Sequence, residues 1–119
     1  DGGPQIELEV MTEHAPANVA NCFAAVLREA LSNTMRHACA QTVTVRCMEH
    51  PSFYQLIVTD DGVGGVQASG RCAAEGMGLA SMRERIEALG GTFTAGPRAS
   101  AGGWRVFATV PKQQGDEGR

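Results

Sequence analysis

The stretch VTDDGVGG, residues 58–65, ends a run of apolar residues with two adjacent acids and then turns to glycine. It closes the segment FYQLIVTD, whose β-branched and aromatic residues predict a strand. Side chains alternate between faces along a strand, so Asp60 shares its face with Tyr54, Leu56 and Val58. Glycines just beyond Asp60 leave room for a close backbone approach. The pattern predicts either an acid that accepts a hydrogen bond from a ligand's amino group, or a plain Asp-Asp-Gly turn.

The composition indicates one globular domain. The chain has 119 residues, with 43% hydrophobic and 19% charged residues, and its apolar runs are too short for a membrane span. The formal net charge is −3, and the basic residues are scattered, which disfavours nucleic acid as a partner. We expect residues 1–112 to form the domain and residues 113–119 to be a charged tail.

The four cysteines show no metal-binding or redox spacing. Cys22, Cys39, Cys47 and Cys72 lack a C-x-x-C pair, so they are expected to be free thiols, with Cys22 and Cys47 acting as small hydrophobes. The chain starts Asp-Gly-Gly-Pro without a signal peptide or targeting motif, which we interpret as a domain of a longer protein.

Hydrophobic periodicity predicts five strands and two helices. Ile6, Leu8 and Val10 mark a first strand, and a long helix extends from Pro16 to about Cys39. The remaining strands are expected at residues 42–48, 53–60, 92–95 and 104–110, with the second and third forming an antiparallel hairpin. A loop is expected over residues 62–76, followed by a short helix from Leu79 to Leu89 that Gly90 ends as a C-cap. The economical architecture is an α+β two-layer sandwich, a mixed sheet with both helices on one face.

Two further patterns could carry chemistry. Glu29, Asn33, Arg36 and His37 fall within an arc of about 100° on the long helix, beside its apolar stripe, whereas Arg28, Ser32 and Met35 take the outward side. An amide suits Mg²⁺, a cation and an imidazole suit phosphate, and a carboxylate can orient a nucleophile; the alternative is a solvated surface stripe. Gly76 and Gly78 are expected just before the second helix, where free amides favour an anion, unless they form only a hinge.

Together these patterns resemble the Bergerat-fold ATP-binding superfamily of gyrase, the heat-shock chaperone and histidine kinases. REALSNTMRHA resembles its N-box, DDGVG its adenine box and GMGL its second glycine box, in the right order across almost the whole chain. The run GMGLASMRERIEALGGTF is most similar to sensor histidine kinases of the nitrate-sensor and membrane-fluidity-sensor branch. The resemblance therefore implies the catalytic and ATP-binding domain of a two-component sensor kinase.

The resemblance also implies roles for individual residues. Asn33 would hold Mg²⁺, Asp60 would accept from the adenine amine, and Arg36 and His37 would face ribose or phosphates. Glu29 would be catalytic. Related ATPases use this acid as a general base on water, whereas a kinase must avoid hydrolysing its ATP, so a role of Glu29 as a base stays open. The segments that would line the nucleotide are Gly62, Gly64 and Gly65 near the base, and Gly76, Met77, Gly78 and Leu79 over the triphosphate.

One position departs from the family pattern. The family usually has Gly-Thr at the start of the final strand, and here the pair is Gly103-Trp104. Trp104 either stacks near the base or belongs to the core, and a large aromatic residue in a terminal strand favours the core.

The resemblance implies partners that lie outside this chain. The γ-phosphate would go to a histidine on a separate dimerisation domain and then to a response regulator, in the cytoplasm and without membrane insertion by this domain. His14, His37 and His50 all lack the sequence context of an acceptor. An alternative within the same fold is an anti-sigma-type serine kinase or binding protein, and another is an ATP-hydrolysing switch related to gyrase.

Overall fold

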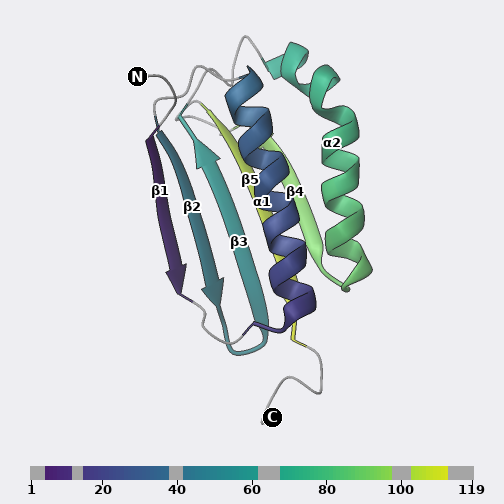
Figure 1. Ribbon diagram of the computed structural model, residues 1–119. Coiled ribbons are helices and arrows are strands. Elements are labelled where there is room, and N and C mark those ends of the chain that lie inside the picture. Colours follow the sequence, from purple (N-terminus) through teal and green to yellow (C-terminus); the bar gives the residue numbers. More distant parts are fainter. Residues whose placement is uncertain (1–4, 12–14, 38–41, 62–67, 98–102, 113–119) are drawn as a thin grey trace.

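The structure, a computed structural model, describes residues 5–11, 15–37, 42–61, 68–97 and 103–112. Its elements are, in order, β1 (Gln5–Met11), α1 (Ala17–His37), β2 (Thr42–Glu49), β3 (Phe53–Asp60), α2 (Ala68–Ala88), β4 (Thr92–Pro97) and β5 (Trp104–Pro111). The strands form one sheet in the order β1-β2-β3-β5-β4. β1 is parallel to β2, and the other neighbouring pairs are antiparallel. Both helices cover the same face of this sheet (Figure 1), which confirms the α+β two-layer sandwich.

The core lies between the two helices and the sheet. On β3 every second residue is buried, ending at Asp60, as the alternation of the sequence predicts. On α1 the buried residues recur at helical spacing, and α2 contributes Met82 and Ile86. The buried residues of α1 are Val19, Cys22, Phe23, Val26 and Ala30.

The connections between elements follow the predicted turn chemistry. The His50 amide donates to the Phe53 carbonyl at 2.8 Å and closes the β2–β3 hairpin. Gly90 has a φ of +80°, and the Gly91 amide donates to the carbonyl of Ile86 at 3.0 Å. The predicted glycine C-cap of the second helix is therefore confirmed.

The start of α2 differs from the prediction. A loop was expected up to residue 76 and a helix only from about Leu79, whereas α2 begins at Ala68. Alanine has the highest helix propensity, and the segment ASGRCAAEG contains three alanines, so it can extend a helix that packing of Met82 and Ile86 already stabilises. Residues 62–67 lie outside the described residues. The prediction failed because the segment lacks an apolar period, and because its two glycines offset the helix propensity of its alanines.

The side chains of two of the four cysteines are described. Cys22 is buried and Cys47 half-buried, both as free thiols, and burial raises the pKa of each. The side chains of Cys39 and Cys72 lie outside the described residues.

Neither α1 nor α2, the helices of the described segments, is apolar enough over its length to be a membrane-span candidate.

Candidate functional site

Asp60 is a buried acid at the end of a central strand. It is the last residue of β3, and it is only 2% exposed. Among the described residues it is the one charged or polar residue that is buried. A carboxylate in such a position is costly unless it has hydrogen-bond partners, so this place in the core calls for a specific interaction.

The neighbouring acid, Asp61, has a different environment. It is exposed, and its Oδ1 accepts a hydrogen bond from the Thr42 amide at 3.0 Å. Its own amide donates to the Thr42 carbonyl at 3.3 Å. Asp61 therefore joins the end of β3 to the start of β2, and only Asp60 points into the interior.

Gly103 and Trp104 lie beside Asp60 at the start of β5. Trp104 is the register partner of Asp60 and is 5% exposed, so it belongs to the core, as expected from its position in a terminal strand. Gly103 has a φ of +91°, and a Cβ there would collide with the Asp60 carbonyl oxygen. The sequence analysis did not assign Gly103 to the site. The feature of the sequence that could have identified it is a glycine directly before the last strand.

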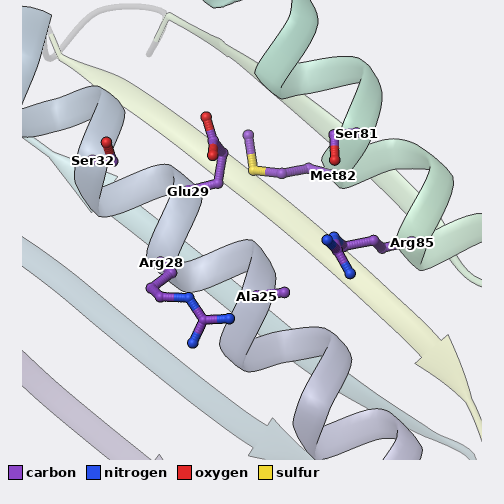
Figure 2. Close-up of a pocket in the computed structure, with 7 residues that line it drawn as sticks. All are labelled: Ala25, Arg28, Glu29, Ser32, Ser81, Met82 and Arg85. Atoms are coloured by element: carbon purple, nitrogen blue, oxygen red, sulfur yellow. The ribbon is translucent and has the colours of Figure 1, made fainter.

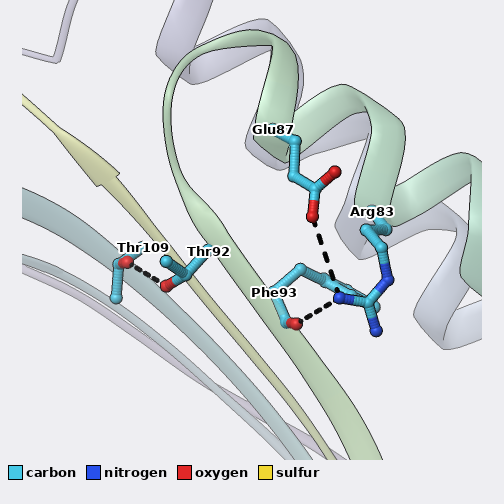
Figure 3. A network of polar contacts seen from close by, with 5 residues as sticks. All are labelled: Arg83, Glu87, Thr92, Phe93 and Thr109. Carbon is cyan, nitrogen blue, oxygen red and sulfur yellow. Dashed lines mark hydrogen bonds and ion pairs between the residues drawn. The ribbon is translucent and has the colours of Figure 1, made fainter.

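The acid of the N-box meets the second glycine box. Glu29 on α1 points towards α2 (Figure 2), and its Oε2 lies 2.5 Å from where a Cβ on Gly78 would stand. Gly78 thus gives the Glu29 carboxylate space that any side chain would occupy. Two motifs that are far apart in the sequence are in contact here.

A cleft of about 360 Å³ runs between the two helices beside this contact. It is lined by Ala25, Arg28, Glu29 and Ser32 of α1 and by Ser81, Met82 and Arg85 of α2 (Figure 2). Arg28 and Ser32 were expected on the outward side of the first helix. Because α2 packs alongside α1, they instead line this cleft. Of the residues predicted for the site, Glu29 lines this cleft.

The second glycine box does not precede its helix in this structure. Gly76, Met77, Gly78 and Leu79 lie within α2, because that helix starts at Ala68. Their amides are therefore not the free first-turn groups on which the predicted anion site depended. The expected position of Gly76 and Gly78 just before the helix is therefore wrong, whereas the contact of Gly76, Met77, Gly78 and Leu79 with the nucleotide stays a prediction.

The other predicted residues fall partly outside the described ones. Asn33, Arg36 and His37 belong to the last turns of α1, but their side chains, like that of Met77, are not among those described. Gly62, Gly64 and Gly65 lie outside the described residues. The end of α1, the end of β3 and the start of α2 nevertheless meet at one end of the sandwich (Figure 1).

Within the described segments, no three His, Cys, Asp or Glu side chains are grouped so that they could hold a metal ion. In many nucleotide sites Mg²⁺ is held mainly through substrate phosphates and waters, with one or two protein side chains. A single amide such as that of Asn33 fits this chemistry.

The sequence comparison assigns the family. Residues 19–114 match the family described as histidine kinase-, DNA gyrase B-, and HSP90-like ATPase, and the chain belongs to it. The sensor kinase UhpB of Salmonella typhimurium is 36% identical over 88 residues, covering 74% of this chain and 16% of UhpB. The nitrate/nitrite sensor NarQ of Escherichia coli is 36% identical over 94 residues, covering 77% of this chain and 16% of NarQ. The chain thus spans about a sixth of these relatives.

Solved structures agree on the fold. The histidine kinase domain of the blue-light activated kinase EL346 from Erythrobacter litoralis superposes with a TM-score of 0.75 at 20% identity, covering 98% of this chain and 55% of that one. The ATP-binding domain of PrrB from Mycobacterium tuberculosis gives 0.62 at 19% identity, covering 94% and 84%. The predicted Bergerat fold is confirmed, and the similarity to NarQ agrees with the predicted nitrate-sensor branch.

Proposed function

We propose that this chain binds Mg·ATP and donates the γ-phosphate to a histidine on a separate dimerisation domain of a sensor kinase. The observation that carries the proposal is the buried Asp60 carboxylate at the end of β3, next to the end of α1 where the N-box lies. The family supports ATP as the ligand, and the names of the sensor kinases support the acceptor. No observation on this chain favours the anti-sigma or gyrase-like alternatives.

The chain's residues would act by positioning and charge. Asp60 accepts from the adenine amine, and the glycines at 62, 64 and 65 let the backbone approach the base. Asn33 would hold Mg²⁺ through its amide oxygen, and the ion would supply positive charge to the phosphates. Arg36 and His37 contact the ribose or the phosphates.

The transfer itself needs little from the protein beyond alignment. A nitrogen of the acceptor imidazole attacks the γ-phosphorus, the bond to the β–γ bridging oxygen breaks, and ADP leaves with that oxygen. Glu29 would orient the incoming group, and Gly78 leaves space for its carboxylate. We expect the domain to work on the cytosolic side, where ATP is supplied, and a response regulator to receive the phosphoryl group afterwards.

Nucleotide selection tests the role of Asp60. The carboxylate can accept a hydrogen bond from the N6 amine of ATP. The 6-oxo group of GTP is itself an acceptor, so the carboxylate and the oxo group would both lack a donor, which costs about 1–3 kcal/mol of binding free energy. Calorimetry should therefore show ATP binding roughly ten-fold or more tightly than GTP. Asp60→Ala should remove most of this preference. The control is Asp61→Ala, which loses the exposed contact with the Thr42 amide and should keep the preference for ATP.

Equal affinity for ATP and GTP, or an unchanged ATP affinity in Asp60→Ala, would contradict the adenine assignment.

Metal dependence tests the role of Asn33. Asn33→Ala should weaken Mg·ATP binding several-fold and leave binding of metal-free ATP nearly unchanged, because only the metal contact is lost. Calorimetry with Mg²⁺ and with EDTA separates the two effects. Ser32→Ala, one position away on the cleft side of α1, is the control. If Asn33→Ala weakened both forms equally, Asn33 would not be the metal ligand.

A further inference from the structure

The apolar side of β1 is exposed. Ile6, Leu8 and Val10 are 49%, 63% and 55% exposed, and they are the large hydrophobic residues that the described structure leaves uncovered. They share the face that carries the core, because Leu8 is the register partner of the buried Val45 and Val10 is that of Cys47. The core-facing side of the sheet therefore continues beyond the two helices that cover it.

Leu8 and Val10 form part of a groove of about 350 Å³, which we call the β1 groove. Strands β1, β2 and β3 form its floor, and α1 forms one wall. The lining residues are all apolar or cysteine: Leu8, Val10, Ala15, Ala20, Phe23, Ala24, Leu27, Val45, Cys47 and Leu56. An apolar groove beside an exposed apolar strand is typical of an interaction surface.

The helix layer ends short of β1. Of the described helices, α1 packs on β3 and α2 packs on β4 and β5, so neither lies over β1 (Figure 1). The core face of β2 is already covered at Val43 and Val45, which are buried, so the open part is β1 and the groove between it and α1. Because an α-helix with its side chains is about 10 Å across, one helix laid along β1 beside α1 would cover this part.

A second copy of this chain fits the surface poorly. If two β1 strands paired antiparallel about Leu8, Glu7 of each would face Glu9 of the other, and like charges directly opposite destabilise a sheet. Such pairing would also extend the sheet at its edge without covering the β1 groove. The charges on β1 therefore oppose edge-to-edge dimerisation.

We propose that the β1 groove binds one amphipathic helix from another part of the same polypeptide. Its apolar residues, spaced at i, i+3, i+4 and i+7, would cover Ile6, Leu8 and Val10 and pack against Ala20, Ala24 and Leu27 of α1. The inference rests on the proposed function, in which this chain is one domain of a larger kinase, and the curated relatives UhpB and NarQ are about six times as long as the part matched. The helix would pack directly on the element that carries Glu29 and Asn33, and would thereby fix its position.

Cys47 is a native reporter for this contact, since it lines the groove and is only half-buried. Iodoacetamide labelling at pH 8.5, followed by peptide mass mapping, gives its alkylation rate separately from the other cysteines. The rate should be at least ten-fold lower in the full-length parent polypeptide than in the 119-residue chain. Leu8→Glu in the full-length protein should raise it to within two-fold of the rate in the isolated chain.

The matched control is Glu7→Gln, which lies on the opposite face of the same strand and should leave Cys47 protected. Leu8 is exposed in the isolated chain, so Leu8→Glu there should shift the melting temperature by no more than about 2 °C and keep ATP binding. Equal alkylation rates in the short and full-length proteins would overturn the proposal. Sedimentation that shows a dimer of the isolated chain broken by Leu8→Glu would also overturn it, in favour of a second copy. Neither result depends on ATP binding or transfer, so failure of the proposed function would be seen separately.

Discussion

At the residue scale, the two adjacent acids of the adenine box show what a sequence can and cannot assign. Strand alternation predicts that Asp60, and not Asp61, faces the core, and the structure confirms it. The support from Gly103 depends on two strands meeting, since its backbone approaches Asp60 from β5. The glycine before the last strand indicates an unusual backbone position, but it does not reveal that the contact is with Asp60, 43 positions away.

Gly103 should therefore be intolerant of any side chain. Gly103→Ala should lower the free energy of unfolding by about 2 kcal/mol or more, because a φ of +91° is unfavourable for alanine and its Cβ would collide with the Asp60 carbonyl. It should also weaken ATP binding by displacing Asp60. Urea unfolding and calorimetry measure the two effects.

The control for Gly103 is Gly96 in β4, where an added Cβ meets no atom within 4 Å. Gly96→Ala should change the free energy of unfolding by no more than about 0.5 kcal/mol. If both alanine variants were equally stable, the close approach between Gly103 and Asp60 would be wrong.

At the scale of elements, apolar periodicity succeeds where one face of an element packs on the core. It predicts α1, the β2–β3 hairpin and the later turns of α2, where Met82 and Ile86 are buried. It fails for the first turns of α2, whose alanines form a helix without an apolar stripe. The same error placed the second glycine box before the helix, whereas the structure has it inside α2.

Gly78 lies inside α2, so replacing it should change the stability of the protein and the rate of phosphoryl transfer in opposite directions. Gly78→Ala should raise the stability of the helix by up to about 1 kcal/mol, since Glu29 can move its flexible end away from the new methyl group. Moving Glu29 should nonetheless reduce the rate of phosphoryl transfer several-fold. Thermal unfolding and a single-turnover transfer assay report the two quantities.

An unchanged transfer rate in Gly78→Ala would show that the position of Glu29 is not important for the reaction. Ala80→Gly, an exposed position in the same helix, is the matched control. It should lower stability by about 1 kcal/mol and leave the transfer rate unaltered.

At the scale of the whole molecule, the layer architecture follows from counting elements and assigning each an apolar face. The sequence predicts one mixed sheet with two helices on one side, which the structure confirms, whereas the strand order β1-β2-β3-β5-β4 comes from the structure alone. Alternation along β1 identifies a strand, but it does not reveal whether anything covers the apolar side. Whether that side is covered depends on how many helices lie on this face of the sheet and where they pack, which can be seen only in the three-dimensional structure.

The central claim is that this chain supplies ATP chemistry to an acceptor located elsewhere. Incubation with γ-labelled ATP and Mg²⁺, with the chain alone and with the dimerisation domain of its parent protein, tests it most directly. We expect no stable label on the isolated chain, and acid-labile label on a histidine of the added domain. Acid-labile label on the isolated chain, or label on a serine of a partner, would contradict the assignment of a donor domain for histidine phosphorylation.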